Sequence, residues 1–273
     1  RDRNRSVLET DNKFDEDLWE KIVELGWTGI RIPEDYGGLG LGHLELCVIA
    51  EELGRFLAPV PYSSSVYLFT EAIINYGTDE IKKDILPKLV SGEIVGTLGV
   101  TEELHAPTKD NINLVYADGK INGKKIAVPD AGVATHAIVV AKSDKGISLQ
   151  LVDLSTTGVT VEHQENIDES RGHFSISFND VETKLLGDKV SGWELYETLI
   201  NQAAVLFSYE QIGGSQASLD MAINYAKERY AFGRPIGSYQ AIKHKLADMY
   251  IALTLAKSNC CLLYTSDAAD EKV

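Results

Sequence analysis

The chain has 273 residues, of which 44% are hydrophobic and 25% are charged, a composition typical of a globular protein with roughly two or three domains. Its formal net charge of −15 argues against nucleic acid or an anionic membrane surface as the main partner, because long-range repulsion opposes both. No apolar run approaches the roughly 20 residues of a bilayer-spanning helix, and the three cysteines form neither a disulfide framework nor a metal-ligand set. These features favour a cytoplasmic protein.

The N-terminal third of the chain shows the apolar spacing of helices. A first helix is predicted to end at Gly26, a second at Gly54 and a third, over 67–76, at Gly77. Thr78 is followed by two acidic residues and is expected to cap a fourth helix, since a hydroxyl and negative charge both suit a helix start. The apolar side chains expected on the buried faces of the first two helices are Phe14, Leu18, Ile22, Leu25, Leu44, Val48 and Leu53.

The apolar spacing changes near Ile94. Short runs rich in Val, Ile and Thr then alternate with turn signals such as Asp118-Gly119, a pattern typical of a small antiparallel β domain. Beyond this region a long amphipathic helix is predicted over 193–229, and helix resumes from about Ser238. Helices, a β module and helices again indicate an α+β fold without the alternating βα units of a Rossmann fold.

Several motifs argue against particular chemistries. The glycine-rich run Gly37–Gly42 superficially resembles a dinucleotide-binding loop, but no buried strand and phosphate-binding helix frame it, so a turn between helices is favoured. The six histidines show no HExxH motif and no metal-ligand spacing with cysteine, and no GxSxG nucleophile motif occurs. Metal sites and a serine nucleophile are therefore disfavoured.

The segment KERYAFGRPIGSYQAIKHKLADM, residues 227–249, concentrates basic side chains in an acidic chain. Ser238 is expected to cap the helix that follows, so that free N–H groups and a positive helix end face outward. The planar guanidinium of Arg229 suits phosphate oxygens, and together these groups favour an anion such as a pyrophosphate. The alternative is a solvated helix face on which Glu228 and Asp248 balance the positive charge. The basic residues of this helix are Lys243, His244 and Lys245.

This segment resembles the signature of the acyl-CoA dehydrogenases, and the similarity extends through most of the chain. The other matching stretches are GWTGIRIPEDYGGLGLGHLELCVIAEELGR, LPKLVSGE, VTEE, INGKKIAVPDAGVATHAIVVA and YEQIGGSQASLDMAINYAKER. The resemblance implies an α-helical N-terminal domain, a β-barrel middle domain and a C-terminal four-helix bundle. The VPDAGVAT version is similar to a bacterial branch associated with the breakdown of steroid or other unusual acyl-CoA substrates.

The resemblance also implies a function and a set of site residues. The family carries out FAD-dependent α,β-dehydrogenation of an acyl-CoA thioester and passes the electrons to electron-transfer flavoprotein, in homo- or hetero-oligomers. By motif match, Arg229 contacts the FAD pyrophosphate, usually that of a neighbouring subunit, and Phe232 and Gln240 line the same site. Thr101 falls in the family's flavin-contacting TE segment.

The chain departs from the family pattern around the flavin. Many members continue from TE into a Gly-Ser loop, whereas this chain reads TEELHAPTKDN. Many also have Trp and Thr against the flavin where this chain aligns Ala127 and Pro129, and an Arg on the substrate helix where it aligns Ala204. The interpretation therefore leaves open how the flavin is retained.

No residue of the chain is predicted to be the catalytic base. The family's catalytic Glu is expected beyond the end of the chain, and its alternative position aligns near Ala203. Glu210 and Asp220 are interpreted as surface or packing carboxylates. Two hypotheses stay open: a catalytic flavoenzyme, and a non-catalytic partner subunit of a heteromeric dehydrogenase that helps to bind a neighbour's FAD.

The predicted domains follow the family pattern and are expected to be incomplete. They are an N-terminal helical domain over 1–93, with its first helix largely missing, a middle β domain over 94–190 and the start of a helical bundle over 191–260. The tail over 261–273 departs from the family, and its stretch CLLYTSDAADE matches a translated library adapter. The chain is therefore expected to be a fragment, inactive on its own.

Overall fold

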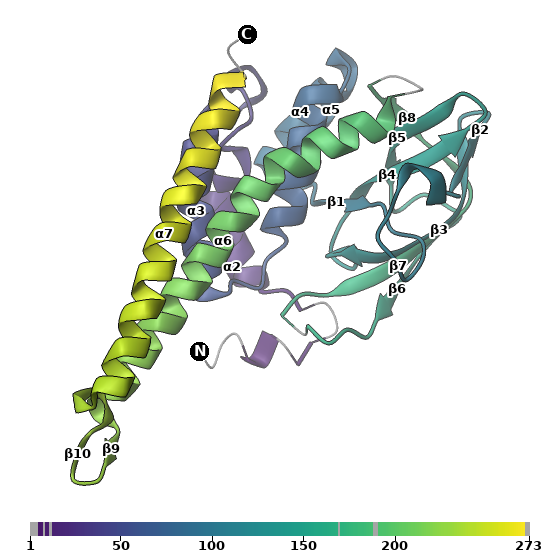
Figure 1. Ribbon diagram of the computed structural model, residues 1–273. Helices are drawn as coiled ribbons and strands as arrows, with labels where there is room; N and C mark the ends of the chain where they lie inside the picture. Colours follow the sequence, from purple (N-terminus) through teal and green to yellow (C-terminus); the bar gives the residue numbers. More distant parts are fainter. Residues whose placement is uncertain (1–4, 8, 11–12, 169, 188–190, 271–273) are drawn as a thin grey trace. The chain divides into compact units, whose positions relative to one another are not determined.

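The computed structural model describes residues 5–7, 9–10, 13–168, 170–187 and 191–270, with the backbone alone for 263–270 (Figure 1). The chain folds into two compact units. Unit 1 comprises residues 1–42 and 59–203, and unit 2 comprises residues 43–58 and 204–273. Within the described residues, none of the helices combines the length and the apolar character that crossing a membrane requires.

The first long helix of unit 1 is α2, Glu16–Glu24. It is capped by Asp15, whose carboxylate accepts the N–H of Leu18 at 3.0 Å, and it ends before Gly26, which adopts a left-handed backbone with φ 73°. The predicted end at Gly26 is therefore confirmed. The short 3-10 helices η1, Trp27–Gly29, and η2, Glu34–Tyr36, follow.

The buried face of α2 differs from the predicted one. Trp19 and Ile22 are its buried residues, whereas Leu25 is 62% exposed because it lies beyond the last turn of the helix. The glycine run that follows forms an irregular segment between η2 and α3, with no strand before it, which confirms the interpretation as a turn.

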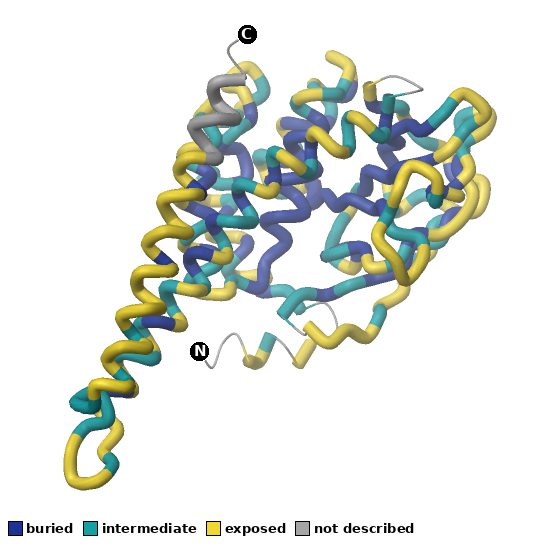
Figure 2. Tube along the Cα trace, viewed as in Figure 1, coloured by how far each residue is buried: buried dark blue, intermediate teal, exposed yellow. Residues whose placement is uncertain are grey.

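A helix that is buried from Ser63 to Ile73 follows, consisting of η3, Ser63–Thr70, with π-helical turns, and α4, Glu71–Tyr76 (Figure 2). It begins earlier than the predicted residue 67, because three consecutive serines resemble a loop in the sequence. Their burial is accommodated by hydrogen bonds: Ser64 donates to the carbonyl of Pro61, and Ser65 accepts the N–H of Gly96.

Helix α5, Asp79–Val90, begins as predicted. The hydroxyl of Thr78 accepts the N–H of Ile81 at 3.3 Å, and the two acidic residues after it occupy the first turn. An exposed ion pair between Lys88 and Asp84, 2.7 Å apart, joins successive turns of the helix.

The β module of unit 1 is one mixed sheet with the strand order β6-β7-β3-β2-β4-β5-β8, in which β1 also pairs with β4. Most pairs are antiparallel, but β1–β4 and β2–β4 are parallel, so the expectation of a wholly antiparallel module is wrong in this respect. The α+β fold class is confirmed. The strands are β1 Gly96–Gly99, β2 Val115–Ala117, β3 Lys120–Pro129, β4 His136–Ser143, β5 Gly146–Asp153, β6 Val159–Gln164, β7 His173–Glu182 and β8 Lys184–Leu186.

The sheet is anchored to the buried helix through β1. A side chain at Gly96 would bring its Cβ within 2.0 Å of the ring of Phe69, so β1 lies directly on η3. An apolar cluster on β3, β4, β5 and β7 fills the core of the module. Strand β3 carries two register shifts against β7, the second of them between Lys125 and Val128.

Unit 2 is helical and comprises α3, His43–Phe56, the part of α6, Gly192–Glu228, from residue 204 onward, and α7, Gln240–Asp270. A short hairpin joins α6 to α7 (Figure 1). Its parts are β9 Tyr230–Ala231, β10 Arg234–Pro235 and the 3-10 helix η5 Ile236–Ser238.

Helices α3 and α6 touch through their backbones. A Cβ on Gly213 would lie 1.8 Å from the carbonyl oxygen of Glu51, and one on Gly54 would lie 2.0 Å from that of Glu210. Only hydrogen fits at these two positions. Helix α7 is joined to α3 by the ion pair of Lys257 with Glu51.

The buried face of α3 is rotated from the predicted one. Leu44 and Val48 are 50% and 62% exposed, so these two predictions are wrong, whereas Leu53 is buried as expected. The residues of α3 that are buried are Leu46, Cys47, Ile49, Ala50 and Leu53.

Candidate functional site

Three of the four predicted site residues lie on one local structure, the α6–α7 hairpin of residues 229–240. In this hairpin the N–H of Ile236 donates to the carbonyl of Arg229 at 2.8 Å, and the hydroxyl of Tyr239 donates to the carbonyl of Ala231 at 2.9 Å. The guanidinium of Arg234 lies 4.0 Å from the centre of the Tyr239 ring, a cation–π contact. Tyr239 thus holds both strands of the hairpin.

The predicted site residues of the hairpin are exposed. The hairpin at the junction of α6 and α7 is mostly coloured as exposed or intermediate in Figure 2. Phe232 is 96% exposed and has a left-handed backbone with φ 52°, an unfavourable conformation for a residue with a side chain. Arg229 and Gln240 are also exposed, and their side chains form no hydrogen bond or ion pair with any described residue. The hairpin therefore presents an aromatic ring, a guanidinium and an amide without internal partners.

The start of α7 differs from the prediction in one detail. The helix begins at Gln240, and the carbonyl of Tyr239 accepts the N–H groups of Ile242 and Lys243. Ser238 is therefore not the cap: its hydroxyl donates to the carbonyl of Pro235 within η5.

The positive charge at this helix start stays uncompensated within the described chain. Arg229, Lys243 and Lys245 are exposed, and none of them forms an ion pair with a described residue. Glu228 and Asp248 form no ion pair with described residues either. Exposed, unpaired charges agree with both interpretations, an anion bound at the positive helix end and a solvated helix face.

Thr101 lies in unit 1, two residues after the end of β1. Its carbonyl accepts the N–H of Ile126 at 2.8 Å, while its half-buried hydroxyl forms no hydrogen bond with any described residue. Beside it, Ala127 occupies the bulge of β3 with φ 51° and an exposed methyl group, and its N–H donates to the Gln164 side chain at 2.7 Å. Bulges of this kind occur frequently beside active sites, where they redirect side chains.

The residues on either side of Thr101, Val100 and Glu102, both contact the buried Lys125, an arrangement that no sequence pattern predicts. The side chain of Lys125 is fully buried, and its Nζ lies 2.6 Å from Oε1 of Glu102 and 3.0 Å from the carbonyl oxygen of Val100. Burial lowers the pKa of Lys125 to about 8, and the bond to Glu102 opposes that shift. The carboxylate of Glu102 also accepts the N–H groups of Asn113, at 2.7 Å, and Leu114, at 3.0 Å.

The loop that departs from the family, residues 103–112, is built locally. It contains the 3-10 helix η4, Lys109–Asn111, whose capping box is formed by Thr108 and Asn111. Its tip is exposed, with Leu104 fully accessible to solvent.

Asp130 of the VPDA motif is buried and belongs to a separate polar cluster of unit 1. Its carboxylate accepts the hydroxyl of Ser64 at 2.5 Å, and the guanidinium of Arg171 lies 3.8 Å away. Burial raises the pKa of Asp130, and the charge of Arg171 opposes that shift. The cluster joins the buried helix to the segment after β3.

The carboxylates of α6 fit the structural roles expected for them. Asp220 pairs with Arg55 at 2.9 Å and accepts the side-chain amide of Gln216, also at 2.9 Å. Glu210 is half-buried beside the crossing with α3. Ala203, at the alternative base position, is buried and carries no proton-accepting group.

A groove of about 1130 Å³ in unit 1 lies away from Thr101. It is lined by residues of α5 and by the starting end of β4, including His136, whose pKa is lowered by burial. Gly96 of β1 pairs with His136 of β4, at the groove. Thr101 comes five residues after Gly96, which corresponds to about 16 Å of extended chain. Within the described residues, no group of three His, Cys, Asp or Glu side chains could hold a metal ion.

Comparison with known proteins assigns the family. The acyl-CoA dehydrogenase N-terminal domain matches residues 3–93, and the acyl-CoA dehydrogenase C-terminal domain matches residues 190–271. The protein named "Probable acyl-CoA dehydrogenase YngJ" of Bacillus subtilis is 32% identical over 262 residues, which cover 90% of this chain and 69% of that protein. The chain belongs to the acyl-CoA dehydrogenase family.

Solved structures of acyl-CoA dehydrogenases share the fold. Butyryl-CoA dehydrogenase from Megasphaera elsdenii has a TM-score of 0.86 at 27% identity, covering 97% of this chain and 74% of that one. The ChsE4-ChsE5 complex from Mycobacterium tuberculosis has a TM-score of 0.87 at 26% identity, covering 98% and 73%. The chain spans about two thirds of the length of the curated relatives it matches, between 65% and 69% for two of them.

Acyl-CoA dehydrogenases are FAD-dependent flavoproteins, and the side chains of this chain fit that cofactor. The guanidinium of Arg229, the amide of Gln240 and the hydroxyl of Thr101 are free of partners among the described residues, and Phe232 offers an exposed ring face. These groups suit phosphate, carbonyl and ring contacts. Their roles, the three-domain boundaries and the bacterial branch stay predictions.

Proposed function

We propose that this chain contributes to an FAD-dependent enzyme that oxidises the α,β bond of an acyl-CoA thioester. The observation that carries the proposal is the α6–α7 hairpin, which presents Arg229, Phe232 and Gln240 without internal partners beside an uncompensated positive helix start. In an acidic chain, such a group of side chains suits the pyrophosphate of a dinucleotide.

Each site residue has a role in this proposal. Arg229 would bind an FAD pyrophosphate through its planar fork, by the family pattern that of a neighbouring subunit, and Phe232 and Gln240 would line the same pyrophosphate site. Thr101 would donate its hydroxyl to a flavin. Bound FAD supplies an acceptor for the hydride that leaves the β-carbon as the α-proton leaves to a carboxylate. The thioester oxygen needs hydrogen-bond donors as negative charge develops on it. No residue of this chain is assigned as the base.

A second candidate function is a non-catalytic partner subunit in a heteromeric dehydrogenase. Two features favour it: the exposed Ala127 methyl in place of a ring that covers the flavin, and the buried Ala203 at the alternative base position. In that case the hairpin serves the FAD of a neighbouring subunit. Reduction of bound flavin by acyl-CoA substrates, measured with a chain extended to the length of its relatives, separates the candidates, because only the catalytic chain needs its own base.

The proposed partners are acyl-CoA, electron-transfer flavoprotein and further subunits of the same or a related chain. Fatty acyl, branched and steroid-side-chain thioesters are the substrate classes to compare. A cytoplasmic location belongs to the proposal and is supported by the three cysteines, Cys47, Cys260 and Cys261, all of which are free thiols.

Binding of FAD by the Arg229→Ala variant tests the proposal. Loss of a charge-assisted phosphate contact of about 1.5–3 kcal/mol predicts roughly a tenfold to hundredfold weaker affinity, measured by quenching of flavin fluorescence. Lys257→Ala is the matched control, because Lys257 is a basic residue of α7 far from its start. Equal affinity for the Arg229→Ala variant and the wild type would contradict the proposed role.

A further inference from the structure

The buried ion pair of Lys125 and Glu102 contacts the segment that carries Thr101. We propose that Lys125 and Glu102 act as positioning residues, which fix the segment after β1 so that the Thr101 hydroxyl is held ready for the flavin. This inference rests on the proposed function, because it concerns the same FAD site.

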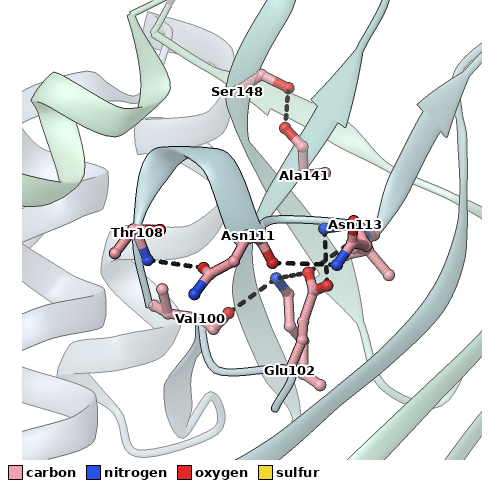
Figure 3. Close-up of polar contacts among 9 residues, drawn as sticks. Val100, Glu102, Thr108, Asn111, Asn113, Ala141 and Ser148 are labelled. Carbon is pink, nitrogen blue, oxygen red and sulfur yellow. Dashed lines mark hydrogen bonds and ion pairs between the residues drawn. The ribbon is translucent and has the colours of Figure 1, made fainter. Parts of the chain in front are cut away.

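Three successive residues after β1 are each fastened. The carbonyl of Val100 and the carboxylate of Glu102 both accept Nζ of Lys125; Val100 and Glu102 are labelled in Figure 3. The carbonyl of Thr101 accepts the N–H of Ile126. All three bonds come from two adjacent residues of β3. The Thr101 backbone is therefore held by its own carbonyl and through both neighbouring residues, while its hydroxyl has no partner among the described residues.

The same carboxylate closes the base of the loop over 103–112. One oxygen of Glu102 accepts both Lys125 Nζ and the N–H of Leu114, and the other accepts the N–H of Asn113. The loop thus leaves and returns at a single charged group that is only 8% exposed. Both ends of the loop are therefore held by Glu102, while its tip around Leu104 is exposed.

A positioning role differs in a measurable way from a role in stability alone. Replacing both partners of a buried ion pair by neutral groups is often tolerated by the fold, whereas removing one partner leaves a buried charge. A double substitution therefore separates the two effects. The double variant should regain stability because it buries no unpaired charge, but it still lacks the hydrogen bond from Lys125 to the Val100 carbonyl.

The experiment compares FAD affinity and thermal midpoint for Lys125→Met, for Glu102→Gln with Lys125→Met, and for the control Lys120→Met. Lys120 also lies on β3 and pairs with a carboxylate, Asp180, at 2.7 Å, but at an exposed site. We expect FAD affinity to fall at least tenfold in both variants at position 125, and by less than twofold in the control. The thermal midpoint should fall in Lys125→Met and return towards the wild-type value in the double variant.

A double-mutant cycle with Thr101→Ala tests whether Lys125 acts through Thr101. If it does, Lys125→Met weakens FAD binding much less in the Thr101→Ala background than in the wild type. Additive losses, or wild-type affinity in the folded double variant Glu102→Gln with Lys125→Met, overturn the inference. Should Lys125→Met not fold, the double variant carries the test. A wild-type chain that binds no FAD overturns the proposed function itself, and this inference with it.

Discussion

The two groups of predicted flavin contacts are built in opposite ways. The α6–α7 hairpin is local, because every contact that shapes it joins residues within about a dozen positions of each other, and its site side chains are exposed. Thr101 is held by contacts such as Lys125 to Val100, which are 25 residues apart and buried. Substitutions at surface sites shaped by local contacts usually cost little stability, whereas substitutions in a buried network cost much more. The two groups should therefore respond differently to the loss of one charge.

The largest expected difference is in stability. Lys125→Met leaves the carboxylate of Glu102 buried without its cation, and we expect the free energy of unfolding to fall by about 3–5 kcal/mol. Arg229→Ala removes an exposed, unpaired side chain and should change it by less than about 0.5 kcal/mol. Urea unfolding of both variants measures the difference. Equal losses would show that the two groups are not built differently.

The pH dependence of stability sharpens the same comparison. Burial lowers the pKa of Lys125 to about 8 from 10.5, so between these values the unfolded chain binds more protons than the folded one. The free energy of unfolding should therefore gain a rising contribution from pH 8 to 10.5. Lys125→Met removes that contribution and Arg229→Ala keeps it. Unfolding curves at pH 7.5 and 9.5 provide the measurement, and the same slope in both variants would contradict the assignment to Lys125.

The smallest expected effect concerns the hairpin. Tyr239→Phe keeps the ring under Arg234 and removes only the bond to the Ala231 carbonyl, a loss of about 0.5–1.5 kcal/mol. Because the hairpin is local, this loss should appear as faster hydrogen exchange at Ile236 with an unchanged thermal midpoint. A lowered midpoint would show instead that the hairpin is coupled to the rest of unit 2.

The hairpin was largely predictable from the sequence and the Thr101 segment was not. Phe-Gly, Pro and Gly residues mark a break between two helical patterns, so the sequence places Arg229, Phe232 and Gln240 near each other. The cap was misplaced, because Ser238 is the usual residue type for a helix start but its hydroxyl bonds to Pro235 instead.

Lys125 and Glu102 carry no local signal, since a Lys and a Glu 23 positions apart look like two solvated charges. Only the pairing of the strands brings them together and buries them. The serine run of η3 was missed for the same reason: its residues are polar in the sequence, and their hydrogen-bond partners, such as Gly96 and Asp130, come from elsewhere in unit 1. Long-range partners decide burial at these positions.

At Gly54 and Gly213 the backbones of α3 and α6 are in contact, so the angle of this crossing determines where the far end of α6 lies within unit 2. From Gly213 to the end of the helix at Glu228 is about 22 Å, at 1.5 Å per residue. A tilt of roughly 5° at the crossing would therefore move the far end by about 2 Å, more than a hydrogen bond to a phosphate tolerates. The position of Arg229 therefore depends on the helix crossing some four turns away, where Gly54 and Gly213 allow close backbone contact because they have no side chains.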